Sequence, residues 1–328
     1  MRKTFVGLAM AVAVALAAPA SAQTRITGSG ASFPFPLYSA WFKDFSGKTD
    51  GVTVDYQSKG SGAGIQDLIN GVVDFAASDA AMKDEDIAKV GQGVVLLPMT
   101  AGEVVLAYNL PGGGELNLPR DVYSDIFLGN VTNWSDPRIA AANEGTVLPD
   151  LPITVVVRSD SSGTTFNFTN HLSAISEAFN AGPGAGTSVQ WPSSDKFVKA
   201  PKNDGVTATI MQTPGAIGYV EYGFAKLTGT AMATLENAAG NFVAPGGEGG
   251  EAALASAKFD DHMRAFITDP EGEDAYPIAT FTWLLFYEQG QDAAKVDALK
   301  KMVEYGLTDG QAMASELGYI PLPESVIE

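Results

Sequence analysis

The chain has 328 residues, carries a formal net charge of −18 and contains no cysteine. Its charge argues against nucleic acid and anionic membrane surfaces as partners, because both are negative themselves. The absence of cysteine excludes disulfides, thiolate metal sites and a lipid attached to an N-terminal cysteine.

The first residues have the pattern of a secretory signal peptide. Met1-Arg2-Lys3 is basic, an apolar run follows from 5 to 18, and Pro19–Ala22 provides the small residues of a cleavage site. The apolar run is shorter than the roughly 20 residues that a membrane-spanning helix needs. We therefore predict a signal peptide at residues 1–22 and export to the periplasm without a lipid anchor.

The rest of the chain alternates between strand and helix patterns. Strands are predicted at 52–56, 72–76, 94–99, 104–108 and 153–157, and helices from near Pro36, from Ile65, at 121–128 with Gly129 as a stop, and at 293–305. Such alternation predicts an α/β architecture built on mainly parallel sheets.

Two weak interruptions of this pattern lie near 100–103 and 269–277. If the chain crosses between two lobes at both places, the first lobe is made from both ends of the chain. The predicted first lobe then comprises residues 23–103 and 276–328, and the second comprises residues 104–275.

Three short segments place glycines and hydroxyls directly before a predicted helix. They are Gly28–Phe33, Gly60–Gly64 and Arg158–Thr164. A helix start presents unpaired backbone N–H groups and a partial positive charge, glycine lets a ligand approach the backbone, and Ser or Thr adds a donor. Each segment alone is compatible with an ordinary capped helix. Three together, one of them led by an arginine, favour an oxyanion site.

Nucleotide-binding motifs fail on spacing. Gly60 and Gly62 lack the third glycine of a dinucleotide fingerprint, because position 65 is Ile65. Gly47-Lys-Thr49 resembles the end of a P-loop, but the upstream position that needs glycine is Phe42. We interpret this tripeptide as the C-terminal turn of a helix.

A secreted phosphate-ester hydrolase is the alternative from the enzyme class. Asp160, Ser162 and His171 are candidates for a triad, but no G-x-S-x-G motif surrounds Ser162. His171 and His262 have no metal-ligand spacing, and we interpret both as surface or partly buried histidines. We therefore expect no enzyme activity, no cofactor and no metal.

Over nearly the whole chain after the leader, the sequence resembles the phosphate-binding proteins of phosphate-specific ABC transporters. The resemblance rests on residues 28–38, 56–65, 74–79, 126–129 with Trp134, 157–165, 215–222, 275–278 and 317–323. It implies the two-lobed α/β fold of type II periplasmic binding proteins, with a double-crossover hinge and the ligand cleft between the lobes. It also implies a monomer that delivers inorganic phosphate to the permease subunits of an inner-membrane ABC transporter. A binding protein for another tetrahedral oxyanion remains an alternative.

The resemblance further implies which residues bind phosphate. They are Ser32, the backbone of Phe33, Ser61 and Asp79 from the first lobe, and Arg158, Ser162, the backbone of Gly163 and Thr164 from the second, with Asp160 orienting the guanidinium. Ser32 stands where threonine is familiar in the family, and it keeps the hydroxyl. Asp79 is unexpected beside an anion. It is either a helix N-cap or an acceptor for the proton that phosphate carries and sulfate lacks.

Overall fold

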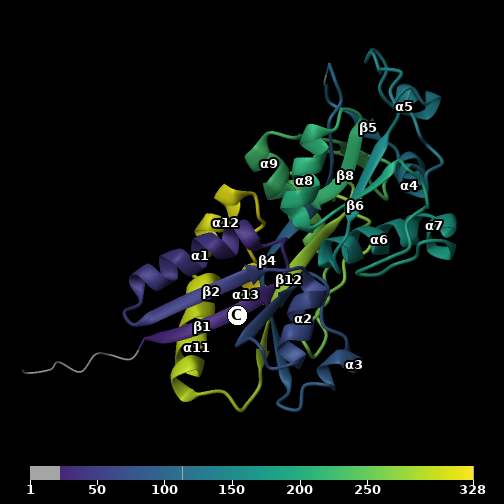
Figure 1. The fold of residues 1–328 in the computed structure, drawn as a ribbon. Coiled ribbons are helices and arrows are strands. Elements are labelled where there is room, and N and C mark those ends of the chain that lie inside the picture. Colours follow the sequence, from purple (N-terminus) through teal and green to yellow (C-terminus); the bar gives the residue numbers. More distant parts are fainter. Residues whose placement is uncertain (1–22, 113, 328) are drawn as a thin grey trace, which may run out of the picture.

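The computed structural model describes residues 23–112 and 114–327, so the predicted signal peptide lies outside the described residues. Two halves share a set of strands, and we divide them where strand β4 changes partner. Figure 1 shows purple N-terminal and yellow C-terminal elements together in one half, and teal and green middle elements in the other. Among the described residues, no helix is long and apolar enough to cross a membrane.

The first half contains elements from both ends of the chain. Its strands and helices are β1 (Thr24–Gly30), α1 (Phe35–Lys48), β2 (Val52–Ser58), α2 (Ser61–Ile69), β3 (Phe75–Ser78), α3 (Asp84–Ile87), β12 (Ala279–Tyr287), α11 (Ala293–Leu307), α12 (Gln311–Leu317) and α13 (Glu324–Ile327). Helix α1 packs against both α11 and α12, so the two chain ends share one core.

The second half is formed by the middle of the chain. Its elements are β5 (Asn117–Leu118), α4 (Arg120–Leu128), α5 (Pro137–Ala142), β6 (Thr154–Arg158), α6 (Gly163–Ile175), α7 (Glu177–Ala181), β7 (Phe197–Ala200), α8 (Lys202–Gln212), β8 (Ala216–Glu221), α9 (Tyr222–Thr228), β9 (Ala231–Met232), β10 (Thr234–Glu236) and β11 (Phe242–Val243). Helix α10 (Glu248–Leu254) follows and packs against β12, with Leu254 in a cluster that includes Ile65 and Phe281.

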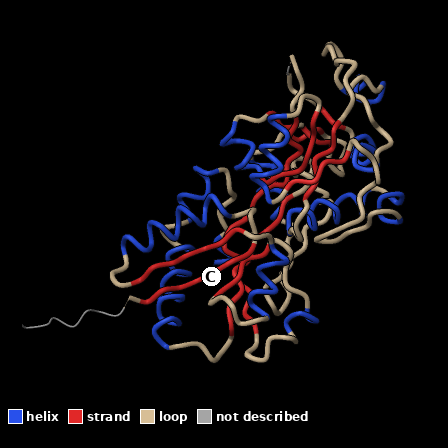
Figure 2. The backbone as a smooth tube through the Cα atoms, viewed as in Figure 1, coloured by secondary structure: helices blue, strands red, loops and turns tan. Residues whose placement is uncertain are grey.

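Strand β4 (Val94–Tyr108) runs through both halves. Among the described residues the main path of paired strands is β2-β1-β3-β12-β4-β8-β6-β7, which Figure 2 shows as red strands continuing from one half into the other. Residues 94–103 of β4 pair with β12, whereas residues 104–108 pair with β8. The partner therefore changes between Glu103 and Val104.

The α/β architecture is as predicted, and helices α1, α2, α4 and α11 lie where the patterns placed them. Gly129 ends α4 in the left-handed conformation, and Gly47 and Lys48 close α1. The prediction of two separate strands at 94–99 and 104–108 is wrong, because the backbone between them stays paired with β12.

Two further predictions about strands need correction. The sheet is mixed, not mainly parallel: β1 pairs in parallel with β2 and β3, and β6 with β7 and β8, but β12 is antiparallel to both β3 and β4, and β4 to β8. The strand predicted at 72–76 begins only at Phe75, after a turn in which Gly71 has a φ of +69°. That turn leaves Val72 exposed.

Helix α2 lies unusually close to β1. A Cβ atom added at Gly64 would lie 2.7 Å from the Ser29 carbonyl oxygen and would also meet the Gly30 backbone. Real side chains do not tolerate such distances to backbone atoms, which cannot rotate away. Glycine at position 64 thus allows α2 to start against the end of β1, where the Gly60 N–H donates to the Gly30 carbonyl at 2.8 Å.

We expect Gly64→Ala to destabilise the protein by about 1–3 kcal/mol through overpacking, although alanine favours helices. The free energy of unfolding is measured by urea titration. Gly47→Ala is the matched control, since Gly47 is also helical and has open space around its Cα. Gly47→Ala should not lower the free energy of unfolding. Equal stability of the two variants would contradict the close approach of α2 to β1.

Candidate anion-binding site

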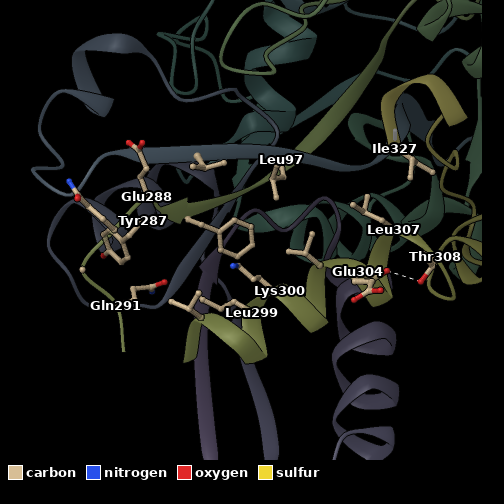
Figure 3. A pocket seen from close by; sticks show the side chains of 16 residues that line it. Leu97, Tyr287, Glu288, Gln291, Leu299, Lys300, Glu304, Leu307, Thr308 and Ile327 are labelled. Carbon is tan, nitrogen blue, oxygen red and sulfur yellow. Dashed lines mark hydrogen bonds between the residues drawn. The ribbon is translucent and has the colours of Figure 1, made fainter. Parts of the chain in front are cut away.

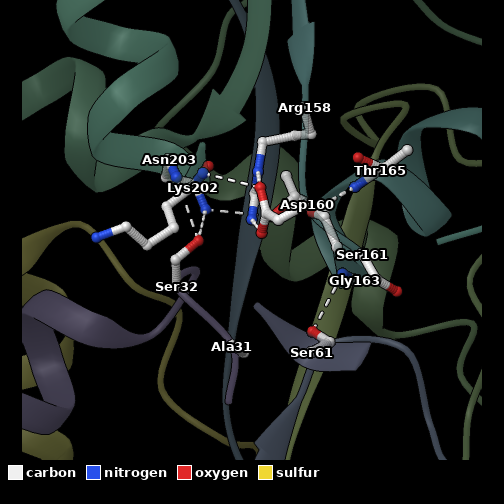
Figure 4. Close-up of polar contacts among 12 residues, drawn as sticks. Ala31, Ser32, Ser61, Arg158, Asp160, Ser161, Gly163, Thr165, Lys202 and Asn203 are labelled. Carbon is white, nitrogen blue, oxygen red and sulfur yellow. Dashed lines mark hydrogen bonds and ion pairs between the residues drawn. The ribbon is translucent and has the colours of Figure 1, made fainter. Parts of the chain in front are cut away.

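The predicted site residues lie at the carboxyl ends of parallel strands. Ser32 follows β1, Ser61 follows β2 and Asp79 follows β3, while Arg158 is the last residue of β6. In open α/β sheets, loops at these strand ends form the usual ligand crevice. The carboxyl ends of these strands in one half face those in the other, so loops from both halves meet here (Figure 4).

Arg158 has a buried guanidinium held by a neighbouring carboxylate. Only 1% of its side chain is exposed. Its Nε donates to Asp160 Oδ1 at 2.8 Å and its Nη2 donates to Asp160 Oδ2 at 2.5 Å. The Lys202 backbone N–H also donates to Asp160, at 2.9 Å. Burial opposes ionisation of Asp160, but the bonds and charge of Arg158 outweigh it and hold the carboxyl pKa below its usual range.

Hydrogen bonds join the two halves directly at this place. The Gly163 N–H donates to Ser61 Oγ at 3.0 Å, and Asn203 donates from its backbone N and its Nδ2 to Ser32 Oγ at 3.2 and 3.0 Å. A Cβ atom at Gly163 would lie 2.5 Å from Asp79 Oδ2. Glycine at position 163 therefore permits this approach of α6 to the first half.

Asp79 is a buried acceptor between the halves. Its Oδ1 accepts from Thr282 Oγ1 at 3.2 Å and its Oδ2 from Ser61 Oγ at 3.4 Å. The N-cap of α3 is Lys83, so the interpretation of Asp79 as a helix N-cap is wrong. Burial raises the Asp79 pKa to about 7, even though Arg158 and the two hydrogen bonds lower it.

The remaining predicted residues lie in the same cluster or beside it. Ser162 caps α6 by accepting from the Thr165 N–H at 3.0 Å, and its buried hydroxyl still has a proton to donate. Thr164 Oγ1 accepts from Arg158 Nη1 at 3.3 Å. Phe33 is buried after β1, and its carbonyl oxygen accepts from Tyr319 at 2.7 Å.

The candidate triad of a hydrolase does not assemble. His171 is buried, and its Nε2 lies 2.8 Å from the hydroxyl oxygen of Tyr123, while Asp160 and Ser162 make the bonds described above. Burial lowers the His171 pKa to about 4. The interpretation of His171 as a surface or partly buried residue is thus wrong, whereas His262 is exposed.

Asn203 also belongs to the cluster, although no sequence pattern predicted it. It is fully buried at the start of α8, after β7 and Pro201. Its Nδ2 also donates to Thr164 Oγ1 at 3.2 Å. The available signal was a further strand followed by a polar residue at a helix start. Residues 201–204 have neither glycine nor hydroxyl, and Gly205 lies inside the helix.

Two of the cavities in the described part of the chain bear on the position of the site. One, of about 570 Å³, is an apolar groove between β4, β12 and α11, lined by residues such as Leu97, Leu299 and Leu307, and it contains no predicted site residue (Figure 3). The other, of about 510 Å³, is lined by Gly62, Ala80 and Ser161. Each of these three is the chain neighbour of a predicted site residue, so this second cavity adjoins the cluster.

Comparisons with known proteins define the family. A model described as a PBP superfamily domain matches residues 17–309. The phosphate-binding protein PstS of Pasteurella multocida is 40% identical over 301 residues, covering 90% of this chain and 86% of that protein. The chain belongs to the PstS family of phosphate-binding proteins. The PstS of Xylella fastidiosa is 39% identical over 301 residues, covering 90% and 81%.

Solved structures show the same fold. The periplasmic phosphate-binding protein PfluDING, bound with phosphate, aligns with a TM-score of 0.75 at 23% identity, covering 93% of this chain and 92% of that one. The phosphate-binding protein from Stenotrophomonas maltophilia aligns with a TM-score of 0.73 at 20% identity and the same coverage. The architecture is that of the two-lobed periplasmic binding proteins.

The raised pKa of Asp79 predicts a pH dependence of stability. Between about pH 4 and 7 the unfolded chain has lost the Asp79 proton and the folded chain keeps it, so this group makes stability fall as pH rises. Its largest contribution to the slope is about 1.4 kcal/mol per pH unit. Asp79→Asn has no such proton.

Urea unfolding of wild type and Asp79→Asn across pH 4–8 measures this effect. The difference in unfolding free energy between them should change steadily up to about pH 7 and then level off. Taking the difference cancels the other titrating groups, including the buried Glu103. A constant difference across the range would show that Asp79 titrates normally.

Proposed function

We propose that this chain binds inorganic phosphate between its two halves and delivers it to an ABC transporter, without turning any substrate over. The observation that carries the proposal is the buried guanidinium of Arg158, which contacts the Thr164 hydroxyl, while Asn203 links Thr164 to the Ser32 hydroxyl of the other half. Its bonds to Asp160 and Thr164 use three N–H groups, and a guanidinium has five. The others are available to an oxyanion, for which the planar fork of arginine is well suited.

The proposed contacts combine many donors with one acceptor. The hydroxyl donors are Ser32, Ser61, Ser162 and Thr164. The N–H donors are the backbone groups of Phe33 and Gly163. Helix α6 also directs its N-terminal end at the site. Once it has lost its own proton, Asp79 would accept a hydrogen bond from the proton that phosphate keeps near neutral pH. Sulfate has no such proton and would set a bare oxygen against the carboxylate, so the same residue disfavours sulfate.

The membership of the PstS family supports a periplasmic location for the mature chain after removal of residues 1–22. We place the lobes at residues 23–103 with 276–328 and at 104–275, on either side of the partner change in β4; α10, from the second range, packs on β12 of the first. The lobes would move about β4 and about the second crossing between them, near residues 269–277, as in hinged binding proteins. We propose that the protein acts as a monomer and meets the transporter's permease subunits in the inner membrane.

Arg158→Ala should weaken phosphate binding at least about tenfold, because a hydrogen bond to a charged group contributes about 1.5–3 kcal/mol. Isothermal titration calorimetry measures the dissociation constant. Arg138→Ala is the matched control, since Arg138 pairs with Asp125 and Asp136 on the exposed surface.

The same samples test the alternatives. Wild type should bind sulfate far more weakly than phosphate and release no phosphate from p-nitrophenyl phosphate. Unchanged phosphate affinity in Arg158→Ala would remove this residue from the site. Turnover of the ester by wild type, and not by a mock preparation, would instead favour the hydrolase.

Closure on the ligand is a second expectation. Ser61 and Gly163 lie on different halves, so neither half can provide the whole set of contacts. Phosphate should therefore reduce the radius of gyration measured by small-angle X-ray scattering. It should also raise stability, by about 2.7 kcal/mol at a hundredfold excess over the dissociation constant. Identical scattering with and without saturating phosphate would mean that the halves do not move.

A further inference from the structure

Asn203 contacts three segments that are far apart in the sequence. Its backbone N and Nδ2 donate to Ser32 Oγ, its Nδ2 also donates to Thr164 Oγ1, and its Oδ1 accepts from the Glu221 backbone N–H at 2.9 Å. The residue is fully buried. Figure 4 shows it beside Ser32, across the cluster from Ser61 and Gly163.

The orientation of the Asn203 amide is fixed by Glu221. A backbone N–H can only donate, so the side-chain atom that faces it must be the carbonyl oxygen. The opposite orientation would set two donors against each other and leave both buried groups unsatisfied. The NH₂ group of Asn203 therefore has to face the hydroxyls of Ser32 and Thr164.

This arrangement determines the direction of both hydroxyl hydrogen bonds. A hydroxyl has one proton to donate and two lone pairs to accept with. Ser32 Oγ receives two N–H groups, both from Asn203, and Thr164 Oγ1 receives one from Asn203 and one from Arg158 Nη1. With their lone pairs occupied, both hydroxyls can still donate, and an oxyanion is the ligand that accepts.

We propose that Asn203 is a positioning residue for oxyanion specificity, which makes the hydroxyls of Ser32 and Thr164 obligatory donors toward the ligand. The inference rests on the proposed function. Ser32 belongs to the first half and Asn203 to the second, so Ser32 acquires this donor direction only when the halves meet. Closure and recognition of the anion are thereby linked through one side chain.

A double-mutant cycle tests the proposal, because coupling appears only between groups that act on each other. Equilibrium dialysis with radiolabelled phosphate measures the dissociation constants of wild type, Asn203→Ala, the pair Ser32→Ala with Thr164→Val, and all three changes together. Asn203→Ala should weaken binding about tenfold in the wild-type chain. It should weaken binding less than about threefold where both hydroxyls are already absent.

A purely structural role gives a different pattern. Asn203→Ala would then weaken phosphate binding by the same factor with and without the two hydroxyls, and that result overturns the proposal. An unchanged phosphate affinity in Asn203→Ala overturns it as well. Asn109→Ala is the matched control, because its Nδ2 donates to Ile210 and Met211 carbonyls at the far end of α8. It should lower the melting temperature without changing phosphate affinity.

A second variant covers the case in which Asn203→Ala does not fold, judged by circular dichroism. Asn203→Asp keeps the side-chain shape and the oxygen that accepts from the Glu221 N–H. Toward the hydroxyls of Ser32 and Thr164 it presents an accepting oxygen in place of the donating NH₂ group. It should bind phosphate more weakly than wild type by at least about a hundredfold. Wild-type affinity in this variant overturns the role of Asn203. If wild type itself binds no phosphate, the proposed function fails instead.

Discussion

Burial of the Arg158 guanidinium is the constraint on which the site depends. A buried charge without a partner costs several kcal/mol, and Asp160 offsets this cost with two hydrogen bonds. The pair is neutral overall, and Asp79 adds a further carboxylate when it is ionised. A phosphate anion therefore gains little from net charge at this place. Its affinity has to come from hydrogen-bond donors with fixed directions. Hydrogen bonds among the buried side chains fix these directions without help from a ligand.

The glycines at the start of α2, in Gly60–Gly64, have a second role that their sequence pattern does not reveal. The pattern indicates close approach of a ligand, but Gly60 lies against Asp160 and Gly62 against Ser161, both in the other half. The Gly62 N–H donates to the Ser161 carbonyl at 3.1 Å. The loops of the two halves thus fit into each other around the cluster. A side chain at either glycine would separate the halves as well as crowd the ligand.

Local patterns predicted the helix starts and the loops that carry the site, because capping residues, glycines and apolar spacing act within a few residues of each other. They failed where structure depends on distant partners. Residues 100–103 look like a break, yet β12, nearly 180 positions later in the chain, keeps them paired. Asn203 has no motif of its own, since its contacts at Ser32, Thr164 and Glu221 come together only in the folded chain. The roles of the site residues followed from resemblance to a family, not from periodicity.

The net charge of −18 and an anionic ligand are compatible because they act over different ranges. At 0.15 M salt, exposed charges are screened beyond about 8 Å, and many of the acidic side chains are exposed to that screening. Buried donors such as the Gly163 N–H contact a ligand directly, in surroundings where hydrogen bonds are stronger than in water. Surface charge therefore affects the approach of phosphate more than its retention. An acidic exterior can repel nucleic acids and anionic lipids, which cannot enter a closed cleft, without weakening the binding of an ion small enough to be enclosed by it.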